Sequence, residues 1–367
     1  MRRITTILLI VCVLCFPLIS SPECQQSVRP VIDLAFCLDT TSSMSGLIEQ
    51  AKVKIWLIIN AVAKVKPTPV LRIAFVVYRD NGDNYVTEVH DFTPDIEGMY
   101  SQLRGFQAQG GGDGPEHVNK ALNDAVNKLS WTNQSLKFLF LVGDAPPHMD
   151  YSDGFHYRNA TAQARSKGII VNAIQCGSDQ ETARVWKEIS NLAGGIYAAI
   201  DYASQSVPIN SPYDLELAKL SDDITGTYVR YGGSGRVNQR AQMKNDAVAL
   251  SDPSAAADRA EAKSGALYKN ENWDLVDAIQ GKSLKIQDIS EESLPPEMRG
   301  LTVAQIEEYV QDKARFRSEL KQQIQKLSEK RKSYLNEEAT KLDAKDSFDR
   351  EVLKALKKQG EEKGVCF

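Results

Sequence analysis

The chain has 367 residues, 42% hydrophobic and 25% charged, which is an ordinary composition for a globular protein and enough length for two or three domains. The formal net charge is −4, and no basic patch interleaved with aromatic residues is present. The composition therefore argues against binding to nucleic acid.

Residues 1–24 predict an export signal. Arg2 and Arg3 precede an uninterrupted apolar run from Ile7 to Phe16, and the small and helix-breaking residues that follow are typical of a cleavage region. The apolar run is shorter than the roughly 20 residues of a membrane-spanning helix. No later segment is long and apolar enough to span a membrane. We therefore predict that the mature protein is exported, either to the periplasm or out of the cell.

Cys12 and Cys15 lie within the apolar run of the predicted signal, and four cysteines lie beyond that run: Cys24, Cys37, Cys176 and Cys366. Cys37 and Cys176 lie inside strand-like runs, where a cysteine is most simply a buried apolar residue. An exported protein can form disulfides, but the spacing of these four residues predicts no particular pairing.

Residues 28–230 alternate between strand-like and helix-like runs. The expected strands are Val31–Leu38, Leu71–Tyr78, Tyr85–His90, Leu136–Val142, Ile169–Ile174 and Ile196–Ile200. The helices expected between and after them lie near residues 45–66, 94–106, 113–129, 157–167, 180–192 and 215–224. Such alternation predicts the α/β class, with a doubly wound, mostly parallel sheet.

Oxygen-bearing side chains follow the first expected strand directly. Asp39, Thr41 and Ser43 alternate along the chain, so an extended or turning backbone can direct all three toward one point. A carboxylate with two hydroxyls suits a hard divalent cation such as Mg²⁺, Mn²⁺ or Ca²⁺. A turn aspartate followed by a serine that caps the next helix would explain the same residues without a metal.

Two further carboxylates are expected at the same edge of the sheet. Asp144 follows the strand Leu136–Val142, and Asp113 lies in a glycine-rich stretch that opens the next helix. Asp113 and Glu116 also have the spacing of a capping box, so Asp113 is alternatively a helix cap. Because open α/β sheets bind ligands at the carboxyl ends of their strands, we predict one cation site. Its predicted ligands are Asp39, Thr41, Ser43, Asp113 and Asp144.

This pattern resembles the von Willebrand factor A domain and its metal-ion-dependent adhesion site. That motif has a D-x-[ST]-x-S loop, which Asp39, Thr41 and Ser43 match, and a later aspartate, which Asp144 matches. The family's glycine-rich loop usually supplies a threonine, where this sequence offers Asp113. The resemblance implies metal-dependent binding of a protein partner that presents an Asp or Glu carboxylate, and no catalysis. The extra negative charge would weaken the recruitment of that carboxylate.

Two alternatives stay open. Phosphotransferases of the haloacid dehalogenase type also place an aspartate after the first strand and a GD motif after a later one, which Asp39 and Gly143-Asp144 fit superficially. However, Thr41 stands where that family needs an acid, and His148 stands where it needs a second acid after the GD motif. The other alternative is a structural scaffold whose site has lost its affinity for metal.

Residues 231–367 predict an α-helical domain, separated from the first by a linker at Gly232–Gly235. A long charged helix is expected from Thr302 to about Leu342. We expect it either to pack on its own domain or to form a short antiparallel hairpin with a helix at Phe348–Gln359, because charged residues interrupt its apolar stripe. Those residues are Lys313, Arg317, Arg331 and Glu338.

Overall fold

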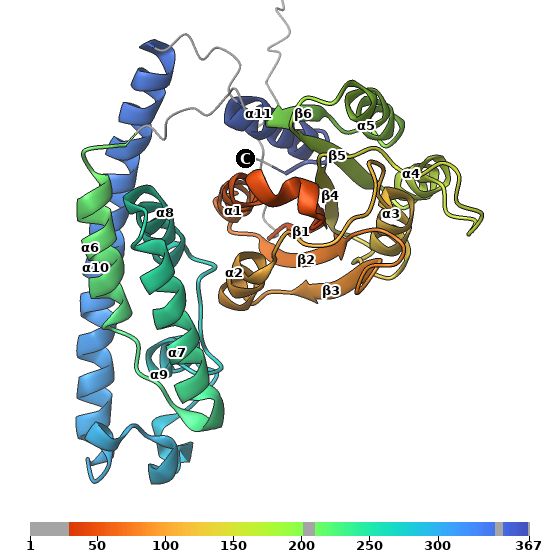
Figure 1. Cartoon of the computed structure of the whole chain (residues 1–367). Helices are drawn as coiled ribbons and strands as arrows, with labels where there is room; N and C mark the ends of the chain where they lie inside the picture. Colours follow the sequence, from red (N-terminus) through yellow and green to blue (C-terminus); the bar gives the residue numbers. More distant parts are fainter. Residues whose placement is uncertain (1–28, 201–209, 342–347, 366–367) are drawn as a thin grey trace, which may run out of the picture.

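The computed structural model describes residues 29–200, 210–341 and 348–365. The predicted export signal, Cys24 and Cys366 lie outside these residues. The described chain forms an α/β part, in which helices cover both faces of a sheet, and a helical part that stands beside it (Figure 1). No helix in the described ranges is both long and apolar enough to cross a membrane.

The sheet of the described chain has six strands in the order β3-β2-β1-β4-β5-β6. All neighbouring pairs are parallel except β2 and β3, which are antiparallel. The predicted doubly wound, mostly parallel sheet is confirmed. The strands are β1 (Val31–Asp39), β2 (Val70–Tyr78), β3 (Thr87–Thr93), β4 (Leu136–Gly143), β5 (Ile169–Cys176) and β6 (Tyr197–Ile200).

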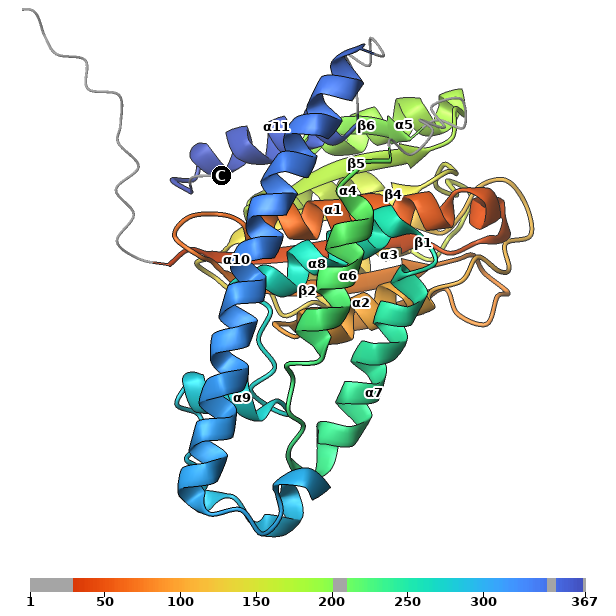
Figure 2. The same cartoon turned by 90° about the vertical axis from the view of Figure 1, so that its left-hand side faces the viewer.

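The helices of the α/β part are α1 (Ile48–Ala63), α2 (Ile96–Gly105), α3 (Val118–Asn127), α4 (Tyr157–Ser166), α5 (Gln180–Leu192) and α11 (Phe348–Glu361). Those of the helical part are α6 (Asp214–Thr225), α7 (Gly232–Ala249), α8 (Pro253–Ser264), α9 (Leu275–Gln280) and α10 (Val303–Lys341). Figure 2 shows α10 running along the whole length of the helical part. The helical C-terminal region is thus confirmed.

Strand β1 shows why the sheet is covered on both faces. Successive side chains of a strand point to opposite faces. Leu34 and Phe36 belong to the apolar cluster that includes residues of α1, α2 and α11. Ala35 and Cys37 belong to the cluster that includes residues of α3, α4 and α5. Cys37 and Cys176 are both buried free thiols, as predicted.

Among the described residues, the last helix, α11, packs mainly against the sheet and α1. It contacts α1 and β6, and its Val352 and Leu356 are buried in the same apolar cluster as the side chains of α1. Gln359 and Asn172 also hydrogen bond through their side-chain amides, at 2.9 and 3.3 Å. Helix α10 packs against α6 and α8, as one of the two alternatives predicted. The other alternative, a hairpin with α11, is wrong, because the apolar face of α11 completes the cover of the sheet.

Within the helical part, two charged residues of α10 pair with carboxylates and are buried. Arg317 donates to Asp274 and Asp277, each at 2.7 Å. Arg331 donates to Asp214 and Asp258, each at 2.6 Å. These two arginines do not weaken the packing of α10, because carboxylates from α6, α8 and the α9 region neutralise them.

Two further features differ from the predicted domain organisation. The four residues Gly232–Gly235 form the first turn of α7, so they are not an extended linker. Helix α6, which the prediction groups with the sheet, packs against α8 and α10. The α/β part is therefore discontinuous in the sequence. The segment from β1 to β6 precedes the helical part, and α11 follows it.

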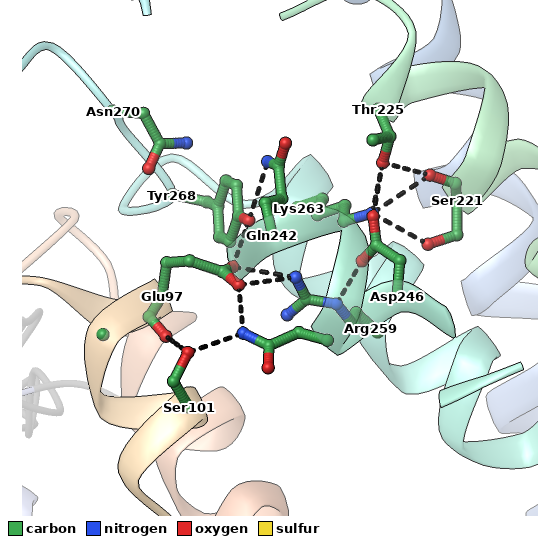
Figure 3. Close-up of polar contacts among 12 residues, drawn as sticks. Glu97, Ser101, Ser221, Thr225, Gln242, Asp246, Arg259, Lys263, Tyr268 and Asn270 are labelled. Carbon is green, nitrogen blue, oxygen red and sulfur yellow. Dashed lines mark hydrogen bonds and ion pairs between the residues drawn. The ribbon is translucent and has the colours of Figure 1, made fainter. Parts of the chain in front are cut away.

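A buried ionic network joins the helical part to α2 (Figure 3). Glu97 accepts two hydrogen bonds of 2.8 Å from Arg259, and it also accepts from Asn245 and Tyr268. Arg259 contacts Asp246 as well, and Asp246 pairs with Lys263 at 2.6 Å. Two cations thus balance two anions, as burial of charge requires.

Candidate functional site

The sheet topology itself indicates where a ligand would bind. The chain runs outward from β1 through β2 to β3, and it then returns to place β4 on the other side of β1. In open α/β sheets, ligands bind at such a reversal of strand order, beyond the carboxyl ends of the strands. Asp39 is the last residue of β1, and Asp144 directly follows β4. Both carboxylates therefore lie at the expected edge.

A series of close oxygen contacts connects four of the five predicted ligands. Asp39 Oδ1 accepts from the backbone N–H of Thr41 at 2.9 Å and from its hydroxyl at 2.7 Å. Thr41 Oγ1 lies 3.0 Å from Ser43 Oγ. The Ser43 hydroxyl donates to Asp144 Oδ1 at 2.9 Å. The structure thus brings Asp39, Thr41, Ser43 and Asp144 together across two loops.

The alternative that these residues merely cap a helix is not what the structure shows. After β1 the chain forms a short 3-10 helix, Ser42–Gly46, and α1 begins only after Leu47. Thr41 stands at the N-cap of the 3-10 helix, yet its side chain makes no capping bond. The hydroxyls of Thr41 and Ser43 are directed at the two aspartates instead.

The site buries negative charge. Asp39 is fully buried, and its Oδ2 has no hydrogen-bond partner among the described residues. Burial and the charge of Asp144 raise the pKa of Asp39 to about 7. Burial also raises the pKa of Asp144. Both shifts reflect the cost of holding like charges together away from water, a cost that a bound cation would remove.

Glu116 lies beside this site, although the sequence analysis treated it only as a capping residue. Its carboxylate is buried, and its Oε2 has no partner in the described structure. Burial and the charges of Asp39 and Asp80 raise the pKa of Glu116 to about 9. An added Cβ on Gly111 would lie 2.9 Å from Glu116 Oε1 and 3.1 Å from Thr41 Cβ, which places the glutamate against the Thr41 loop.

The backbone explains why Glu116 reaches the site. Its N–H donates to the Pro146 carbonyl at 2.9 Å, and its carbonyl accepts from the His148 N–H at 3.1 Å, which ties it to the loop after β4. Helix α3 begins only at Val118, with His117 as its cap. The alternative of a capping box formed by Asp113 and Glu116 is therefore wrong. The apolar periodicity of α3 starts at Val118, after Glu116. That pattern could have indicated from the sequence that Glu116 precedes the helix and is available as a site residue.

Asp113 takes a different position from the other four predicted ligands. Its side chain is exposed, and its Oδ1 lies 3.3 Å from Nε2 of His148. It is outside the series of oxygen contacts that runs from Asp39 to Asp144. The carboxyl group of the glycine-rich segment that lies against the Thr41 loop is that of Glu116.

Comparison with known families gives a match that spans most of the α/β part. Residues 33–210 match the family described as von Willebrand factor A domain. The chain contains a von Willebrand factor A domain. A curated relative, a putative ariadne-like RING finger protein of Acanthamoeba polyphaga mimivirus, is 29% identical over 121 residues. That match spans 33% of this chain and 12% of the relative.

Two solved structures with matching segments have lower identity. BatB from Bacteroides thetaiotaomicron is 18% identical with a TM-score of 0.36, covering 46% of this chain and 90% of BatB. Proximal thread matrix protein 1 from the mussel byssus, solved with a zinc-occupied MIDAS motif, is 13% identical with a TM-score of 0.38. That match covers 49% of this chain and 43% of the matrix protein.

The donor set of the A-domain site fits a hard divalent cation. Carboxylate and hydroxyl oxygens are the ligands that Mg²⁺, Mn²⁺ and Ca²⁺ prefer. The 3.0 Å between Thr41 Oγ1 and Ser43 Oγ is close to the edge of about 2.9 Å expected for an octahedron of oxygens around Mg²⁺. When each hydroxyl gives its one hydrogen to an aspartate, these two oxygens face each other with lone pairs. A cation between them would stabilise that arrangement.

Proposed function

We propose that the A domain binds a divalent cation of the Mg²⁺, Mn²⁺ or Ca²⁺ class and, through it, an acidic side chain of a protein partner. The observation that carries this proposal is the buried and unpartnered Oδ2 of Asp39, at the head of a chain of oxygens that ends on Asp144. Asp39, Thr41, Ser43 and Asp144 would hold the ion. The ion would supply the positive charge that attracts the carboxylate of the partner.

Glu116 bears on the strength of this attraction. With Asp39 and Asp144, it makes a third carboxyl group at the site, and a bound cation of charge +2 favours its ionised form over the neutral form expected without metal. An extra negative charge weakens the attraction for a carboxylate that approaches from outside. We infer that partner binding through this metal is weaker than it would be with an uncharged residue at position 116.

Binding is proposed in preference to catalysis. A nucleophilic aspartate must be reached by its substrate, and Asp39 is fully buried with one oxygen held by Thr41. Thr41 and His148 stand where a haloacid dehalogenase has acids. The proposal includes export, so that the partner is met outside the cytoplasm, on the evidence of Arg2, Arg3 and the apolar run that follows.

Calorimetric titration of the full chain with Mg²⁺, Mn²⁺ and Ca²⁺ tests the cation site. Ser43→Ala should weaken binding, because it removes the hydroxyl that bridges Thr41 and Asp144. Ser42→Ala is the matched control, since Ser42 is exposed in the same loop. Equal affinities for these two variants, or no binding of any cation by the wild type, would refute the proposal and favour a scaffold role.

A screen of phosphatase substrates tests the catalytic alternative. We expect no turnover that depends on Asp39. Activity that persists through purification and disappears on Asp39→Asn would show instead that the chain is an enzyme.

A further inference from the structure

A second cluster of metal-binding groups lies among the loops after β2 and β4 and in the glycine-rich segment. His148 Nε2 lies 3.4 Å from Asp80 Oδ2 and 3.3 Å from Asp113 Oδ1. All three ligand atoms lie within 4.8 Å of one another. We propose that Asp80, Asp113 and His148 form a second cation site, which takes a borderline transition-metal ion of the Zn²⁺ class. It shares no residue with the Asp39–Asp144 site.

The distances from His148 to the two aspartates suit a tetrahedral ion. Zn²⁺ binds nitrogen and carboxylate oxygen at about 2.1 Å, and two such ligands of a tetrahedron are then about 3.4 Å apart. The contacts of His148 with the two aspartates have that length. Three protein ligands leave the fourth position of the tetrahedron for water or a group from another molecule. The imidazole nitrogen favours Zn²⁺ over Mg²⁺ or Ca²⁺, which prefer oxygen.

The imidazole is held in the orientation that a metal ligand needs. His148 Nδ1 lies 2.8 Å from Asp150 Oδ1, so the Asp150 carboxylate can accept the Nδ1 proton and leave the Nε2 lone pair directed at the two aspartates. The ring also stacks on Tyr151, with centroids 4.1 Å apart. A histidine that donates its other nitrogen to a carboxylate is the usual arrangement around protein-bound zinc.

Asp80 provides independent support for a cation site, because its carboxylate is buried and one of its two oxygens lacks a hydrogen-bond donor in the described structure. Only 5% of this residue is exposed, and its Oδ1 has no hydrogen-bond partner in the described structure. Its Oδ2 accepts from the Tyr151 hydroxyl at 2.6 Å and faces His148. A buried carboxylate with a free oxygen is costly unless a cation or a further donor meets it. Asp113 is exposed at the outer side of the cluster, so an ion can enter there.

The glycine-rich segment is shaped to bring Asp113 over Asp80. Asp83 Oδ2 accepts from the Asp80 N–H at 3.1 Å and from the Gly111 N–H at 2.8 Å, which ties the two loops together. Gly110 and Gly111 have φ of +76° and +74°, values that side chains rarely allow. A Cβ on Gly110 would also collide with the Asp83 carboxylate. The two glycines are therefore required for the close approach of these loops.

Titration of the full chain with Zn²⁺, and with Co²⁺ as a spectroscopic probe, tests the proposal. We expect a Zn²⁺ site that persists in Asp39→Asn and is lost in His148→Ala. Asp150→Asn should weaken Zn²⁺ binding by about 10- to 100-fold, as for other residues that orient a metal-binding histidine. His90→Ala is the control for loss of a histidine, because His90 lies on β3 and pairs with Glu88.

Unchanged Zn²⁺ affinity in His148→Ala would overturn the proposal. Loss of all Zn²⁺ binding in Asp39→Asn would also overturn it, because that result would assign the ion to the Asp39–Asp144 site. If His148→Ala does not fold, Asp113→Asn decides, because Asp113 is exposed. A wild type that binds neither Zn²⁺ nor Co²⁺ would show that the cluster is an ion pair between the imidazolium and the aspartates.

Discussion

The buried network between α2 and the helical part gives a quantitative prediction for Glu97→Gln. The substitution keeps the size of the side chain and removes one of the two negative charges that balance Arg259 and Lys263. Removing one partner of a buried ion pair costs about 3–5 kcal/mol of unfolding free energy. We therefore expect a loss of at least about 3 kcal/mol at pH 6.

The loss should shrink as the pH rises, because Lys263 can release the excess charge. Burial and the neighbouring charge of Arg259 lower the pKa of Lys263 to about 8 in the intact network. Without Glu97, which helps to keep it protonated, that pKa should fall further. Near pH 9 Lys263 is neutral in both proteins, so the network of the variant no longer carries a surplus positive charge and the cost of the substitution is smaller.

Urea unfolding at pH 6 and pH 9, followed by circular dichroism, measures both effects. Glu261→Gln is the matched control, because it makes the same chemical change in a pair that also joins the α/β part to α8. The Lys64–Glu261 pair is 53% and 26% exposed, and exposed pairs contribute about 0–1 kcal/mol. The reasoning fails if Glu97→Gln costs no more than Glu261→Gln, or if its cost grows with pH.

Three further outcomes follow from the packing and charge of single residues. Gly111→Ala should destabilise the metal-free protein by about 1–3 kcal/mol in thermal unfolding, because Gly111 has a φ of +74° and the Cβ of the alanine would collide with Glu116. Gly112→Ala is the control and should cause no such loss, because the space around Gly112 is open. Leu356→Ala should lower the unfolding free energy by about 2–5 kcal/mol in denaturant unfolding, because Leu356 is buried. Leu353 is 36% exposed, so Leu353→Ala should lower it clearly less. Similar losses in the two variants would show that α11 does not pack on the sheet. Without metal, the stability that protonated Asp39 contributes is fully present below its ordinary pKa of 3.8 and is lost as the pH rises through about 7. The unfolding free energy of Asp39→Asn should therefore rise relative to that of the wild type between these two pH values. Parallel pH profiles of stability for the two proteins would contradict this.

Much of the α/β part could be predicted because its elements are set by local patterns. Buried strands such as β1 and β4 are almost continuously apolar, and the polar residue at the end of each is conspicuous. That is why Asp39 and Asp144 could be assigned to one edge of the sheet. The hydroxyls of Thr41 and Ser43 followed from their spacing after Asp39.

What could not be predicted depends on contacts between distant segments. Glu116 reaches its position through a backbone bridge to the loop after β4, and nothing near it in the sequence indicates that partner. Asp113 lies next to His148, 35 residues away. Arg317 looked like an interruption of an apolar stripe because its carboxylate partners lie 40 or more residues earlier.

The place of α11 over the sheet has a consequence for the order in which the protein can fold during synthesis. The helical part, α6 to α10, is made after β6 and before α11, yet α11 covers α1 and β6. As the chain leaves the ribosome, the area over β6 and beside α1 that α11 covers therefore stays exposed until the whole helical part has been translated. Exposed apolar surface of this kind promotes association of incomplete chains. Chains that stop before α11 should consequently be captured by chaperones more strongly than complete ones.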